Sequence, residues 1–158
     1  MLQAHHLGAS KIQSYGNILH GDWRYYRIPA CGQSENKCGV CIILSDKWMQ
    51  FIFHSQQVVE GRAHYLLLKI SDLVYGFLNI YVPNDRAACK GFWTHFVQQL
   101  PHVDHWCMGS DFNMIEAAGD RVVGSDVVLA GCELASWERL CFSLKLEDTR
   151  CLAPPLIS

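Results

Sequence analysis

The chain has 158 residues, of which 50% are hydrophobic and 18% are charged, and its formal net charge at pH 7 is −2. This length suffices for one domain with a single hydrophobic core, and the composition excludes an intrinsically disordered chain. The slightly negative charge excludes a protein that binds nucleic acid through an evenly basic surface, while a locally basic groove stays open.

No run of apolar residues approaches the roughly 20 that a membrane-spanning helix needs, so we expect neither a membrane segment nor a membrane partner. The first residues, MLQAHHLGASKIQ, lack the basic segment and the apolar core of a secretory signal. We therefore expect a nuclear or cytoplasmic protein that is not secreted.

Eight cysteines are spread along the chain among apolar neighbours. Because no secretory signal is expected, we predict reduced thiols, mostly in the core, rather than a disulfide framework. Cys38 and Cys41 form a C-x-x-C pattern, which a zinc site would have to complete with further ligands such as His102, His105 and Cys107. Cys38 fits a loop and Cys41 fits an inward strand position, so we favour a structural interpretation of this pair.

Secondary structure follows from the spacing of apolar residues and from the turn residues between them. The predicted elements are, in chain order, a helix over Ser10–Leu19, strands over 22–30 and 40–45, strands that begin near Met49 and Arg62 with a break at Glu60-Gly61, a strand from about Val74 that ends at Pro83, a helix over Arg86–Leu100, a short buried strand over 106–108 that Gly109 and Ser110 break, and a helix over Cys132–Leu144.

These elements predict a single α+β domain over residues 1–158. Successive strands outnumber strand-helix-strand units, so the sheets should be mostly antiparallel. Helices with one apolar stripe should cover the outer faces of two packed sheets.

Polar residues gather where two predicted strands end. Tyr81 and Asn84 lie in NIYVPND, and Asp111 and Asn113 lie in SDFNM. If the two strands are neighbours, their ends share one edge of the sheet, where a carboxylate could align a water molecule, an amide could hold a phosphate oxygen and a phenol could donate to developing negative charge. The structural alternative is that Asp and Asn are ordinary turn residues and that Tyr81 belongs to the core.

A family resemblance is carried by six segments: LQAHHLGASKIQ, KCGVCIILSDKW, VVEGRAHYLLLKI, GFLNIYVPNDRAACKGFW, GSDFNMIEAAGDRVVG and GCELASWERLCFSLKLEDTR. In this order they resemble the endonuclease/exonuclease/phosphatase superfamily, and more narrowly the endonuclease domain of plant-type LINE retrotransposons, which are relatives of the apurinic endonucleases. The resemblance covers nearly the whole chain. It implies a four-layer α/β/β/α sandwich, Mg²⁺ as the cofactor, DNA as the partner and hydrolysis of a phosphodiester bond as the reaction.

The same resemblance implies roles for four residues. Tyr81 matches the tyrosine that faces the phosphate, and Asn84 stands beside it as a substrate-binding residue. Asp111 and Asn113 match the Asp-x-Asn pair that aligns the attacking water and stabilises the transition state. Asp111 is also the expected metal ligand.

Two departures from the family pattern bear on activity. The family's L-Q-E-x-H segment supplies a metal-binding glutamate, and Ala4 stands at that position in this chain. Mg²⁺ prefers oxygen ligands, so the neighbouring His5 and His6 are poor replacements. The family's first strand and its last strands, with their Asp-His pair, are expected to be missing, so we expect a fold that is incomplete at both ends.

Two functions stay open at this point. The first is a Mg²⁺-dependent endonuclease whose activity is weak or lost, with phosphatase chemistry on an inositol phosphate or a nucleotide as a variant of it. The second is an inactive, retrotransposon-derived fragment that binds nucleic acid or a partner protein. Neither function requires a small-molecule cofactor.

Overall fold

The structure is a computed structural model that describes residues 2–3, 23–28, 39–83, 86–111 and 131–147. Its elements are β1 (Leu2–Gln3), β2 (Trp23–Ile28), β3 (Val40–Ser45), the 3₁₀ helix η2 (Asp46–Phe51), β4 (Ile52–Val59), β5 (Ala63–Ile70), β6 (Leu73–Tyr81), α2 (Arg86–Val97), β7 (His105–Asp111) and α3 (Gly131–Leu144).

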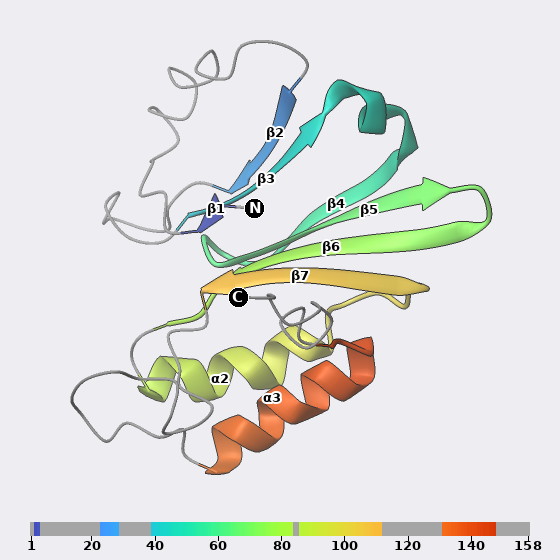
Figure 1. Cartoon of the computed structure of the whole chain (residues 1–158). Helices are drawn as coiled ribbons and strands as arrows, with labels where there is room; N and C mark the ends of the chain where they lie inside the picture. The colour runs from blue at the N-terminus through green and yellow to red at the C-terminus, as the bar shows by residue number, and fades with distance from the viewer. Residues whose placement is uncertain (1, 4–22, 29–38, 84–85, 112–130, 148–158) are drawn as a thin grey trace, which may run out of the picture.

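The described elements form three layers (Figure 1). A three-stranded sheet in the order β1-β3-β2 packs on a four-stranded sheet in the order β4-β5-β6-β7, and α2 and α3 lie against the opposite face of the four-stranded sheet. The predicted α+β class is confirmed. The predicted helix over Ser10–Leu19, which would supply a further layer, lies outside the described residues.

Local turns and one helical crossover determine the order of the four-stranded sheet. Strands β4, β5 and β6 are joined by two tight turns, in which Gly61 and Ser71 adopt left-handed backbone conformations with φ of 62° and 56°. Such turns produce antiparallel neighbours. The chain then passes through α2 before β7, and β7 therefore pairs parallel to β6.

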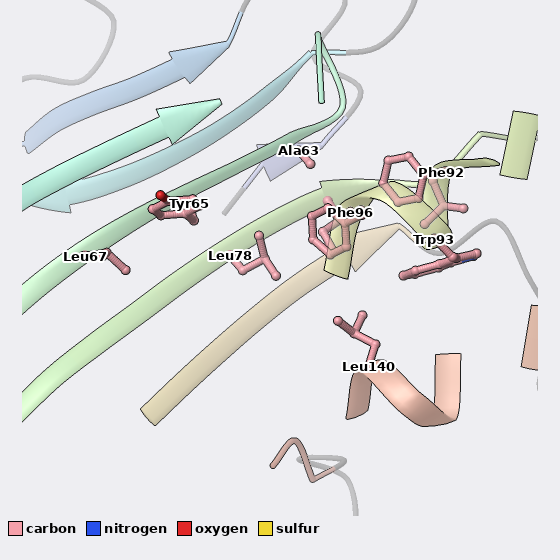
Figure 2. Packing of buried hydrophobic residues seen from close by; sticks show 10 residues of the cluster. Ala63, Tyr65, Leu67, Leu78, Phe92, Trp93, Phe96 and Leu140 are labelled. Carbon is pink, nitrogen blue, oxygen red and sulfur yellow. The ribbon is translucent and has the colours of Figure 1, made fainter. Parts of the chain in front are cut away.

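The main core lies between the four-stranded sheet and the two helices (Figure 2). Alternation along a strand sends every second side chain to this face, and the register places Ala63, Tyr65 and Leu67 of β5 beside residues of β6 on the same face. The buried members of this core are Ala63, Tyr65, Leu67, Leu78, Ile80, Val82, Phe92, Trp93, Phe96 and Leu140. Helix α2 buries Phe92, Trp93 and Phe96 in this core and α3 buries Leu140, so both described helices cover the outer face of the four-stranded sheet.

Three boundaries differ from the sequence-based expectation. Met49 does not begin a strand, because residues 46–51 form η2 where the chain crosses from one sheet to the other. Gly109 and Ser110 do not break the strand at Met108, because the backbone there pairs with Asn79 and Ile80 of β6. Helix α2 stops at Val97, and the predicted last turn is a looser one in which the Leu100 amide donates to the Val97 carbonyl.

Cys41, Cys107 and Cys141 form no disulfide bond: Cys41 is buried, Cys141 is partly buried and Cys107 is exposed. The expectation of a buried strand is therefore wrong at Cys107. Among the described residues, no three His, Cys, Asp or Glu side chains are arranged to hold a metal ion, and Cys38 lies outside them. None of the described helices combines the length and the apolar character needed to cross a bilayer.

Gly76 gives a sharp test of this packing. It pairs with Trp106 of β7, and a Cβ atom built on Gly76 would overlap the Trp106 ring, which also meets Tyr65 edge to face. We expect Gly76→Ala to cost about 1–3 kcal/mol of unfolding free energy, measured by urea denaturation, because the indole has to move. Gly91→Ala is the matched control: Gly91 is on the exposed side of α2 with open space around it, and the change should stabilise the helix by about 0.5–1 kcal/mol. Equal changes in unfolding free energy for Gly76→Ala and Gly91→Ala would contradict the close contact between Gly76 and Trp106.

Candidate rim of the four-stranded sheet

The ends of β6 and β7 lie side by side at one edge of the four-stranded sheet, which we call the rim. These strands run parallel (Figure 1), and their last paired residues are Tyr81 and Asp111. Parallel neighbours end at the same edge, which is where loops on a rigid scaffold commonly carry function. The structure thus brings together two of the residues that the sequence singled out.

The other predicted site residues lie outside the described part of the chain. Asn84 and Asn113 follow the rim strands closely in sequence, and Ala4 follows β1 directly. Strand β1 pairs with β3, with Gln3 opposite Val40 and Leu2 opposite Cys41. Tyr81 and Asp111 end strands of the four-stranded sheet, whereas β1 belongs to the three-stranded sheet.

Arg62 is a rim residue that the sequence-based reasoning did not identify. Its guanidinium lies over the Tyr81 ring, 5.4 Å from the ring centre, and Nη1 donates to the Tyr81 carbonyl oxygen at 3.4 Å. The Tyr81 amide in turn donates to the Arg62 carbonyl at 2.7 Å. Both side chains are half-buried, so a cation and a phenol share one partly desolvated position, which suits an anionic group such as a phosphate.

A buried polar layer lies behind the rim, on the face of the sheet that meets β3. His64 of β5 pairs with Asn79 of β6, and both are buried, with 4% and 0% of their surface exposed. His64 Nε2 lies 2.7 Å from Ser55 Oγ, and Nδ1 has no hydrogen-bond partner among the described residues. Desolvation by burial lowers the pKa of His64 from its usual 6.5 to about 4, so the imidazole is neutral at physiological pH.

The Asp-His dipeptide in the described part of the chain, Asp104-His105, does not serve the rim. These residues stand at the start of β7, and Asp111 ends it, so about 20 Å of extended strand separates the two ends. Both have structural roles there. An Asp104 carboxylate oxygen accepts from the Val74 amide at 2.7 Å, and the His105 ring stacks on Tyr75 at 5.2 Å.

The described rim does not by itself fit a Mg²⁺ ion. Mg²⁺ takes octahedral oxygen ligands, usually with one or two carboxylates, and Asp111 is the acidic residue at the described strand ends of the rim. At position 4, where the resemblance implies a second carboxylate, the chain has alanine. The described residues of the rim thus supply one of the two carboxylates that the resemblance implies.

Comparison with known proteins gives a partial match. No family model matches the chain. In an 89-residue alignment that covers 54% of the chain, it is 27% identical to the Transposon TX1 uncharacterized 149 kDa protein of Xenopus laevis. The matched region amounts to 7% of the length of that protein. The chain is thus similar to a small part of a transposon protein.

Proposed function

We propose that this chain is a retrotransposon-derived domain of the endonuclease/exonuclease/phosphatase type that holds a DNA phosphate at the rim and hydrolyses the phosphodiester bond weakly or not at all. The similarity to a transposon protein supports the origin. The six sequence segments that resemble the superfamily support the domain type, including the four-layer sandwich with a helical layer on each sheet.

One observation carries the proposal for the rim: Arg62, Tyr81 and Asp111 come from three neighbouring strand ends and meet at one edge. In this arrangement the guanidinium would neutralise a phosphate oxygen and the Tyr81 phenol would donate to another. The resemblance implies that Asp111 aligns the attacking water molecule, and its backbone pairs with that of Tyr81.

The alternative function is an inactive module that binds nucleic acid or a partner protein. Ala4 favours this alternative, because the position lacks the carboxylate that the family uses. The version that binds nucleic acid would use the same phosphate-holding rim. Binding of DNA and cleavage of DNA therefore have to be measured separately.

The test is binding of a fluorescent DNA duplex at several salt concentrations, measured by anisotropy. We expect Arg62→Met to weaken binding about tenfold at low salt and to reduce the salt slope by about one phosphate contact, because the methionine keeps the stem and removes the charge. Tyr81→Phe should weaken binding to a smaller degree without changing the salt slope.

Lys69→Met is the matched control. Lys69 is exposed on the same strand pair and pairs with Val74 far from the rim, so its loss removes the same charge from a different place. If Lys69→Met and Arg62→Met weaken binding equally, the rim has no special affinity for phosphate. The proposal is wrong if the unmodified chain binds no DNA even at low salt.

A further inference from the structure

Asn79 is a buried amide located directly behind the rim. It lies on β6 two residues before Tyr81, and its side chain is fully buried. Alternation along a strand places residues 79 and 81 on the same face of the sheet, the one that meets β3. The register puts Asn79 between His64 of β5 and Gly109 of β7.

The amide links the two sheets. Asn79 Nδ2 donates to the carbonyl oxygen of Cys41 on β3 at 2.8 Å, in a buried position. A second link lies nearby, where the Gly39 amide donates to the Gly61 carbonyl at 2.8 Å. Gly39 precedes β3 and Gly61 precedes Arg62, so both links lie at the rim end of the sheets.

Burying an amide side chain such as that of Asn79 between two sheets costs free energy unless its hydrogen bonds are made, and here the bond to Cys41 requires one arrangement of the sheets. Other residues that fill the layer between the sheets, such as Leu66 and Leu68, are apolar and tolerate small shifts of one sheet over the other. A hydrogen bond to a backbone carbonyl tolerates much less, because its strength depends on distance and angle. The link therefore specifies how β6 sits on β3.

We propose that Asn79 is a positioning residue for the rim, which fixes Tyr81 relative to the three-stranded sheet. Asn79 donates from β6 to β3, so the link joins the four-stranded sheet, which carries the rim, to the three-stranded sheet. Its value for phosphate binding rests on the function proposed above. The placement of Tyr81 by Asn79 is independent of that function.

The first experiment compares Asn79→Leu with Ile80→Val. Both residues are fully buried on β6, but Ile80 belongs to the core under the helices, whereas Asn79 faces β3. The readout is the NMR signal of the Tyr81 ring in protein with labelled tyrosine, assigned through Tyr81→Phe. We expect Asn79→Leu to shift the Tyr81 signal clearly and Ile80→Val to leave it in place, even where both lower the melting temperature.

The second experiment is a double-mutant cycle on DNA affinity with Asn79→Leu and Tyr81→Phe. If Asn79 acts through Tyr81, the loss caused by Asn79→Leu, which we expect to be about fivefold, shrinks when Tyr81 is already phenylalanine. Additive losses together with an unmoved Tyr81 signal would overturn the inference. If Asn79→Leu does not fold, Asn79→Ser replaces it, because serine cannot reach the Cys41 carbonyl and adds no bulk.

The two proposals fail in distinguishable ways. If the chain binds no DNA, the proposed function is wrong. The NMR signal of the Tyr81 ring still shows whether Asn79 positions that ring. A chain that binds DNA through Arg62, with a Tyr81 signal that Asn79→Leu does not move, keeps the function and overturns the role of Asn79.

Discussion

Supercoiled plasmid incubated with this chain and Mg²⁺ is expected to remain supercoiled. A bound metal ion stabilises the charge that develops on a phosphodiester by several kcal/mol, and each 1.36 kcal/mol is a factor of ten in rate. With alanine at position 4, we expect cleavage on the order of a thousandfold slower than with a complete metal site. The measurement is nicking followed by gel electrophoresis, with and without Mg²⁺.

Ala4→Glu is expected to tighten Mg²⁺ binding without restoring nicking. A second carboxylate adds a hard oxygen ligand, but a metal ligand does not supply a general base, and a positioned base is commonly worth 10²–10⁴-fold. The described Asp-His dipeptide lies at the other end of β7 and cannot supply it. Nicking by the unmodified chain that requires Mg²⁺ and disappears in Asp111→Ala would contradict this prediction and assign cleavage to the rim.

Stability is expected to fall steeply between pH 6.5 and pH 4 because of His64. The pKa of His64 is about 4 in the folded chain and 6.5 in an exposed histidine, so the unfolded state binds the proton more readily. The stabilisation is complete above pH 6.5 and is lost as the pH falls to 4, where the loss reaches about 3 kcal/mol. Protonation would place a charge in the layer between the sheets, beside Asn79.

Urea denaturation across pH 4 to 7.5 measures this effect. His64→Gln should remove most of the loss of about 3 kcal/mol between pH 6.5 and pH 4, because glutamine does not bind a proton. His102→Gln is the matched control, because it makes the same substitution at an exposed histidine. Equal slopes for the unmodified chain and His64→Gln would show that another group governs the acid sensitivity.

Local patterns in the sequence predicted most of the described strands and both described helices. The turn at Glu60-Gly61 was predictable because glycine tolerates the left-handed backbone that the hairpin adopts there. The 3₁₀ helix η2 was not, because its aromatic residues favour strands and only the need to cross between sheets overrides that preference.

The candidate site was predictable only in part. Tyr81 and Asp111 follow strand patterns and could be placed at strand ends, but their pairing depended on β6 and β7 being neighbours. Arg62 could not be placed on the rim, because its contact with Tyr81 depends on the register of β5 against β6. Sequence spacing does not fix register to one residue, and a shift by one would turn the side chain to the other face.

The crossover through α2 also has a consequence for the order in which the molecule assembles. Strands β4, β5 and β6 pair through short turns, so they can form in sequence with little loss of chain entropy. Strand β7 joins only after the chain has closed a long loop and α2 has packed on the sheet. We therefore expect Tyr81 to reach its place early in folding and Asp111 to arrive late, so that the rim is completed in one of the last steps.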